Sequence, residues 1–190
     1  MDQLSTAYRG MFPVTFVGGE LGSWRVESCT AVVGTALPSV ECLDVRTAID
    51  ASPPGRWSLR GVAGHVRYVE SREKPELDAR SPKLGRDSAV CAALIPIRKS
   101  QAWWALPQDE RRAIFEARSR HISDTIKYLP RIARRLYHAR DLGEEFDFLT
   151  WFEFAPEDGG AFDELLALLR SREEWTYVEH EVELRLRRDG

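Results

Sequence analysis

Two side chains in the second half of the sequence could together do chemistry on a small anion. His121 supplies an imidazole, and Arg134 follows it along the chain with Pro130 between them. A neutral imidazole can ligate the iron of a heme from one side. A permanently charged guanidinium on the other side would attract an anion to that iron. We therefore test the hypothesis that His121 is an axial heme ligand and that Arg134 handles an anionic substrate.

The local pattern around both residues also has an ordinary explanation. His121 precedes Ile122 at the edge of an apolar stripe, which is typical of a partly exposed helix histidine. Arg134 belongs to a basic cluster with Arg131 and Arg135, and such clusters are usually solvated helix faces. From local pattern alone, the ordinary explanation outweighs the hypothesis for each residue.

The elements that carry these two residues are predicted to be helical. Pro107 suits the first turn of a helix, and apolar residues recur with helical spacing as far as Leu129. Pro130 disfavours helical geometry at Leu129, so a second helical piece should run over residues 131–140. The break at Pro130 would let His121 and Arg134 flank one cavity.

The remaining pattern predicts an antiparallel sheet. Residues 90–97, 146–154 and 175–187 have strand character, and a helix with apolar residues at Phe162, Leu165, Leu166 and Leu169 lies between the last two. In the last strand, alternate residues from Val178 to Leu186 should pack, and the intervening charged residues should face water. This order of elements predicts an α+β fold with helices packed on an antiparallel sheet.

Composition indicates which kinds of partner and cofactor attachment the protein could have. The 190 residues carry a net charge of −3, which gives no argument for nucleic acid or an anionic membrane as partner. The three cysteines are odd in number, and neither a metal-like spacing nor a C-x-x-C-H motif occurs, so a heme here would be bound non-covalently. The N-terminus has no secretory-signal pattern, and together these features lead us to expect a cytoplasmic location.

Several motifs closely resemble the chlorite dismutase family over residues 57–190. They are residues 93–100, Trp103-Trp104, residues 109–116, His121-Ile122, Lys127-Tyr128-Leu129-Pro130, residues 132–138, residues 146–153 and residues 173–179. The short N-terminal part resembles the branch with a truncated first domain, whose members are homodimers. The resemblance implies a ferredoxin-like dimeric α+β barrel with two antiparallel sheets flanked by helices. Residues 1–88 would form the truncated first subdomain and residues 89–190 the heme-binding subdomain.

The resemblance also implies roles for individual residues. His121 matches the axial ligand of heme b, Arg134 the catalytic arginine, and Glu174 the carboxylate that accepts a hydrogen bond from the ligating imidazole. Without the resemblance, Glu174 would be read as an ordinary acid in a turn. The other implied residues are Lys99, Tyr68 and Trp104 around the cofactor, and Thr150 and Phe152 in the pocket above it. Ser81 aligns with a glutamine that lies beside the catalytic arginine in some relatives. The hydrogen bonding of the arginine in those relatives is therefore not carried over to Arg134.

The implied reaction converts chlorite into chloride and dioxygen. Cleavage of a Cl–O bond at the iron would leave a ferryl oxygen and a hypochlorite fragment, which Arg134 would hold by charge and hydrogen bonds. The nearest alternative is a coproheme decarboxylase or peroxidase of the same superfamily, against which Arg134 argues. A heme-binding or heme-delivery protein without turnover, and a structural dimer without heme, also remain open. Release of dioxygen from chlorite separates the first interpretation from the others.

Overall fold

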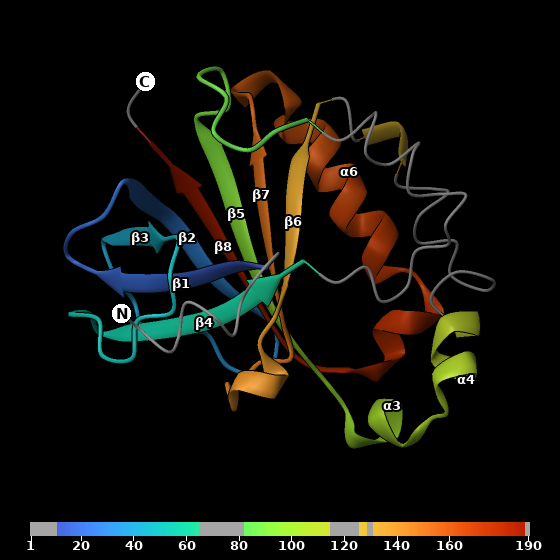
Figure 1. The fold of residues 1–190 in the computed structure, drawn as a ribbon. Coiled ribbons are helices and arrows are strands. Elements are labelled where there is room, and N and C mark those ends of the chain that lie inside the picture. Colours follow the sequence, from blue (N-terminus) through green and yellow to red (C-terminus); the bar gives the residue numbers. More distant parts are fainter. Residues whose placement is uncertain (1–10, 65–81, 115–125, 129–130, 189–190) are drawn as a thin grey trace.

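Eight antiparallel strands form a closed barrel in the part of the chain that the structure describes. The computed structural model describes residues 11–64, 82–114, 126–128 and 131–188. The strands follow the order β1-β3-β2-β8-β5-β7-β6-β4, and β4 closes the barrel onto β1 (Figure 1). Their bounds are β1 Phe12–Gly19, β2 Trp24–Val33, β3 Cys42–Arg46, β4 Trp57–Ala63, β5 Cys91–Lys99, β6 Ala133–His138, β7 Phe148–Phe154 and β8 Val178–Arg187.

Helices and short 3-10 turns accompany the second half of the barrel. They are α3 Gln101–Ala105, α4 Gln108–Arg112, α6 Gly159–Arg170, η2 Ile126–Tyr128, η3 Arg140–Leu142, η4 Pro156–Asp158 and η5 Glu173–Tyr177. The predicted spacing in α6 is confirmed, because Phe162, Leu165, Leu166 and Leu169 are all buried against the outer face of β5 and β7. The predicted mixed α+β class is thus confirmed.

No helix among the described residues has the length and apolar character needed to cross a membrane.

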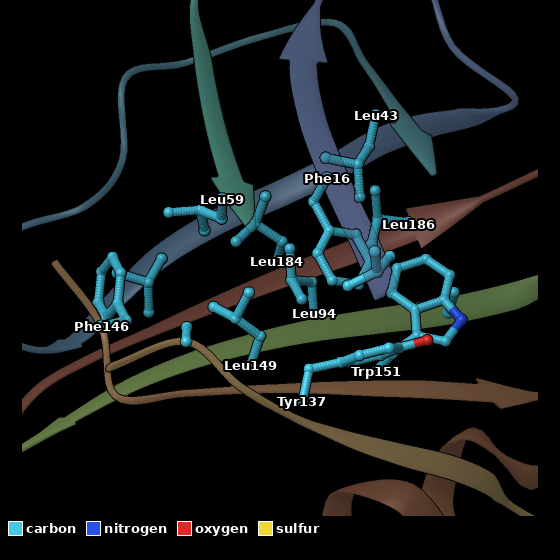
Figure 2. Packing of buried hydrophobic residues seen from close by; sticks show 14 of the residues in the cluster. Phe16, Leu43, Leu59, Leu94, Tyr137, Phe146, Leu149, Trp151, Leu184 and Leu186 are labelled. Atoms are coloured by element: carbon cyan, nitrogen blue, oxygen red, sulfur yellow. The ribbon is translucent and has the colours of Figure 1, made fainter. Parts of the chain in front are cut away.

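The barrel interior holds the larger apolar core. Phe16, Leu94, Tyr137, Trp151 and Leu184 meet there from five strands (Figure 2). The ring of Phe16 lies 5.5 Å from that of Trp151 and 5.7 Å from that of Tyr137, measured between centroids. Full burial of one such side chain contributes roughly 1.5–3 kcal/mol. Because side chains alternate along a strand, each residue between two core residues must point outward.

The prediction of a helix over residues 131–140 is wrong, because this segment contains strand β6. Its residues pair in register with β7, including Arg134 with Phe152 and Arg135 with Trp151. Tyr137 faces the barrel core, whereas Arg134 and Leu136 face outward. A segment with many arginines has no strong intrinsic strand preference, and pairing with the apolar strand β7 decides its conformation.

The long helix predicted before Pro130 is seen only in part. Helix α4 ends at Arg112, and Ile126–Tyr128 is a 3-10 turn. Residues 115–125, which include His121, and residues 129–130 lie outside the described residues. The position of His121 therefore stays a prediction.

The last strand departs from its predicted pattern on one face. Strand β8 begins at Val178, and the residues before it form η5. Val182, Leu184 and Leu186 pack in the core as expected, whereas Val178 is partly buried against the outer apolar cluster. On the opposite face, Glu181 is 0% exposed. This face is covered because Arg170 of α6 binds Glu181 and Glu183.

Candidate functional site

A small, mostly apolar pocket lies between the outer face of the barrel and the segment from α6 to η5. It has a volume of about 80 Å³. Its lining residues are Ile95, Ile97, Lys99, Trp103, Arg134, Leu136, Phe148, Thr150, Phe152, Leu166, Leu169, Glu174 and Trp175. Three of them carry charge, namely Lys99, Arg134 and Glu174. A pocket of apolar walls with few convergent polar groups is the usual form of a small-molecule site.

A second, larger hollow lies at the other end of the protein. It has a volume of about 930 Å³ and is lined by the turns around Gly19–Ser23, Ser39–Glu41 and Pro54–Arg56. None of the predicted site residues that the structure describes lines it. The smaller pocket, which gathers buried charges among apolar side chains, is therefore the candidate site.

Arg134 contributes a positive charge to the pocket wall that β6 forms. The two-residue period of β6 turns it toward the pocket beside Leu136, while its neighbour Arg135 points away and lies over the ring of Phe12. Burial lowers the pKa of Arg134 from its ordinary value, and the negative charge of Glu174 acts in the opposite direction. Because that ordinary value lies far above neutrality, Arg134 remains a cation at pH 7.

A buried ion pair forms a second polar feature of the pocket. The Nζ atom of Lys99 lies 2.8 Å from Oε1 of Glu174 and also donates to its backbone carbonyl at 3.2 Å. Lys99 is 4% exposed and Glu174 is 6% exposed. The ammonium also lies 4.9 Å from the ring centroid of Trp103 and 5.2 Å from that of Trp175. Lys99 therefore holds the Glu174 carboxylate in one place.

Asp147 organises the segment that follows β5. Its Oδ2 atom accepts hydrogen bonds from the backbone N–H of Lys99 at 2.7 Å and from the indole of Trp104 at 3.1 Å. Its Oδ1 atom accepts one from Arg140 at 3.0 Å. The ring of Trp104 stacks on Phe148, which lines the pocket. Asp147 thus ties the end of β5 to the pocket wall.

The structure brings together most of the predicted site residues that it describes. Lys99, Arg134, Thr150, Phe152 and Glu174 all line the one pocket. Trp104 is not among the lining residues and lies behind Phe148. Tyr68, Ser81 and His121 lie outside the described residues.

Sequence reasoning missed three residues with polar side-chain groups around this pocket. Trp103 and Trp175 line it, and Asp147 anchors its edge. The only signal for Asp147 was an acid within an otherwise apolar strand. Trp103 stood out only as part of the Trp103-Trp104 pair, and its indole N–H is buried and has no hydrogen-bond partner among the described residues. A buried unpaired donor costs about 1–3 kcal/mol, so its place in the pocket wall points to a ligand acceptor.

Comparison with known proteins assigns the family. The family model described as chlorite dismutase matches residues 44–187. The chain belongs to the chlorite dismutase family. The match runs from within β3 to the end of β8 and therefore includes every residue that lines the pocket.

Individual chlorite dismutases agree with this assignment. A solved structure, described as a dimeric chlorite dismutase from Nitrobacter winogradskyi, is 53% identical with a TM-score of 0.87, and the match covers 93% of this chain and 99% of that one. The chlorite dismutase of Ideonella dechloratans is 31% identical over 114 residues. That match covers 59% of this chain but only 38% of the curated relative.

A mutant chlorite dismutase from Candidatus Nitrospira defluvii shares the fold at 21% identity and a TM-score of 0.64. That match covers 95% of this chain and 92% of the other.

Proposed function

We propose that this protein binds heme b non-covalently and decomposes chlorite into chloride and dioxygen. The observation that carries the proposal is Arg134, a cation at the wall of an apolar pocket that also contains the buried Lys99–Glu174 pair. Membership of the chlorite dismutase family and the 53% identity to the Nitrobacter winogradskyi chlorite dismutase support it.

The residues that line the pocket suit a heme in their chemical character. The walls are aromatic and aliphatic, as a flat apolar ring system requires, and the buried indole N–H of Trp103 is a donor for a polar group at its edge, such as a propionate. We propose that His121 is the axial ligand and that Tyr68 and Trp104 also contribute to cofactor binding. When bound, heme supplies an iron that accepts the anion and exchanges electrons with it.

Glu174 would act on the ligating imidazole. A carboxylate that accepts a hydrogen bond from a ligating histidine orients the ring and increases its basicity. Lys99 keeps Glu174 in place through the 2.8 Å contact and limits the cost of burying its charge. We therefore assign Glu174 to the orientation of His121 and Lys99 to the positioning of Glu174.

Arg134 would retain the chlorine-containing anion while the O–O bond forms. Chloride and dioxygen together account for all atoms of one chlorite ion, so no fragment should leave before both oxygen atoms have joined. A guanidinium in an apolar pocket holds such a fragment by charge-assisted hydrogen bonds, which are stronger there than in water. It does not shuttle protons, because it does not deprotonate usefully. Thr150 and Phe152 shape the space beside it.

The assembly, subdomains and location follow from the same proposal. We propose a homodimer, since the Nitrobacter winogradskyi relative is described as dimeric. We propose two ferredoxin-like subdomains over residues 1–88 and 89–190, which are consistent with β1–β4 in the first and β5–β8 in the second. The free thiols of Cys29, Cys42 and Cys91 are compatible with a cytoplasmic location.

The test is dioxygen release from chlorite by heme-loaded protein in an oxygen electrode. We expect one dioxygen per chlorite for the native sequence. Arg134→Ala should keep its heme but turn over poorly and release hypochlorite, which a chlorination trap detects. Arg135→Ala is the matched control, because Arg135 is the next residue on the same strand and points away from the pocket.

Three outcomes would each contradict a part of the proposal. Heme-loaded native protein that releases no dioxygen would indicate a heme-binding or heme-delivery protein instead. Equal turnover and no hypochlorite from Arg134→Ala would remove the role of Arg134. Full heme occupancy and an unchanged ferric spectrum in His121→Ala would remove the ligand assignment.

A further inference from the structure

A buried carboxylate outside the pocket holds one of the pocket walls. The indole N–H of Trp175 donates to Oε2 of Glu181 at 2.7 Å. The other oxygen of Glu181 accepts two hydrogen bonds from Arg170, at 2.9 Å from Nε and 2.6 Å from Nη2. Glu181 is 0% exposed, and it does not line the pocket. Both oxygens of its carboxylate thus accept hydrogen bonds, one from Arg170 of α6 and the other from Trp175.

The charge of Glu181 is balanced by a network that leads to the surface. Arg170 also donates to Glu183 at 2.6 Å, and Glu183 accepts a second hydrogen bond from Arg185. Burial acts to raise the pKa of Glu183, but these hydrogen bonds and the two positive charges outweigh it, so its pKa lies below the usual value. Burial acts to lower the pKa of Arg170, but the same carboxylates outweigh it and raise that pKa. The network therefore keeps Glu181 next to a stable cation.

Trp175 connects this network with the charged pair of the pocket. It lines the pocket and is the neighbour of Glu174 in the 3-10 turn η5. Its ring centroid lies 5.2 Å from Nζ of Lys99, whose other aromatic neighbour is Trp103 at 4.9 Å. A rotation of Trp175 would remove one of the two rings that enclose the Lys99 ammonium and would loosen the turn that carries Glu174.

We propose that Glu181, paired with Arg170, is a positioning residue that fixes Trp175 and, through it, the Lys99–Glu174 pair. A buried ion pair often contributes no more to stability than apolar residues of similar volume. Stability alone therefore does not explain why Glu181 is buried with Arg170. This positioning role rests on the proposed function, in which Glu174 orients the ligating imidazole. Glu181 itself touches neither substrate nor cofactor.

Two variants weaken or remove the same hydrogen bond, one from the acceptor side and the other from the donor side. Glu181→Gln removes the charge that faces the indole, and Trp175→Phe keeps an aromatic wall but removes the N–H donor. Glu183→Gln is the matched control, because it removes one partner of Arg170 and leaves the bond between Trp175 and Glu181 untouched. If Glu181→Gln does not fold, Trp175→Phe alone still tests the proposal.

The first measurement uses heme-free protein. The indole ¹H–¹⁵N resonance of Trp175 is assigned as the one that disappears in Trp175→Phe. In Glu181→Gln we expect this resonance to move upfield and its proton to exchange faster with solvent, since the charged acceptor is lost. In Glu183→Gln neither property should change.

The second measurement uses heme-loaded protein. A misplaced Glu174 gives a weaker hydrogen bond to the imidazole and a less basic ligand. We therefore expect a lower iron–histidine stretching frequency in the ferrous protein and a higher midpoint potential in both Glu181→Gln and Trp175→Phe. Glu183→Gln should match the native protein in both properties.

The outcomes separate this inference from the proposed function. If native protein releases dioxygen from chlorite but Glu181→Gln and Trp175→Phe match Glu183→Gln in frequency and potential, the positioning role is wrong. An unchanged Trp175 resonance in Glu181→Gln overturns it as well. If the heme-free resonance responds as expected but native protein releases no dioxygen, the proposed function fails while the contact between Glu181 and Trp175 stands.

Discussion

Replacement of Lys99 by methionine tests the buried ion pair of the pocket most directly. Methionine keeps an unbranched apolar side chain against Trp103 and Trp175 and removes only the ammonium. Glu174, at 6% exposure, would then be a buried carboxylate without its lysine. Removal of one partner of a buried ion pair costs about 3–5 kcal/mol, because the other buried charge loses that counter-charge.

The expected loss can be expressed as a shift in melting temperature. The attraction between the ammonium and the two aromatic rings is also lost, but the methionine sulfur makes contacts of similar energy with the same rings, at about 0.5–1 kcal/mol for each kind of contact. We therefore expect Lys99→Met to lower the free energy of unfolding by about 4 kcal/mol. For a chain of this size that corresponds to a decrease in Tm of roughly 8–16 °C. Urea unfolding of heme-free protein, followed by tryptophan fluorescence, measures the free energy directly.

The neighbouring residue provides the control. Arg98 precedes Lys99 on β5 and pairs with Glu179 at 3.0 Å, with 39% and 47% of the two side chains exposed. Exposed pairs contribute about 0–1 kcal/mol, so Arg98→Met should cost no more than that. The double variant Lys99→Met/Glu174→Gln should recover at least half of the loss, because the buried carboxylate that faced Lys99 is then replaced by a neutral amide. If Lys99→Met costs no more than Arg98→Met, our account of the pair is wrong.

Two further predictions concern stability elsewhere in the fold. Gly34 has a φ of +82°, and an added Cβ would lie 2.8 Å from Cδ2 of His180, so Gly34→Ala should cost more than Gly143→Ala, which has a φ of +73° and open space around it. We expect about 1 kcal/mol for the second variant and about 2–3 kcal/mol for the first, measured by urea unfolding, and equal costs would exclude a steric role for His180. The lowered pKa of Glu183 stabilises the fold above its ordinary value of 4.5, and this contribution is lost as the pH falls through the lowered value. The difference in stability between native protein and Glu183→Gln should therefore be largest near neutral pH and shrink below pH 4.5, and a difference that grows on acidification would refute the assignment.

Local sequence pattern was sufficient to predict the elements in which hydrophobic residues recur with one clear period. The alternation in β7 and β8 and the spacing of Phe162, Leu165 and Leu169 in α6 predicted these elements correctly. These elements each bury a continuous apolar face, so the period of hydrophobicity reports their conformation directly. The resemblance to the chlorite dismutase family added five residues that the structure gathers in one pocket: Lys99, Arg134, Thr150, Phe152 and Glu174.

Other features depend on contacts that local pattern does not contain. Residues 133–138 carry three arginine or histidine side chains and no clear period, and only pairing with β7 makes them a strand that turns Arg134 toward the pocket. Glu181 stands in an alternation that predicts exposure, and only Arg170 of α6 and the indole of Trp175 make its burial possible.

The sequence by itself therefore determined the periodic elements and, through the family resemblance, the candidate site residues. The tertiary structure decided which charges meet. Lys99 and Glu174 are 75 residues apart, and the packing of η5 against the end of β5 brings them within 2.8 Å. The reason is physical, because hydrophobic period is a property of neighbours along the chain, whereas the partner of a buried charge is set by strand register and packing between distant segments.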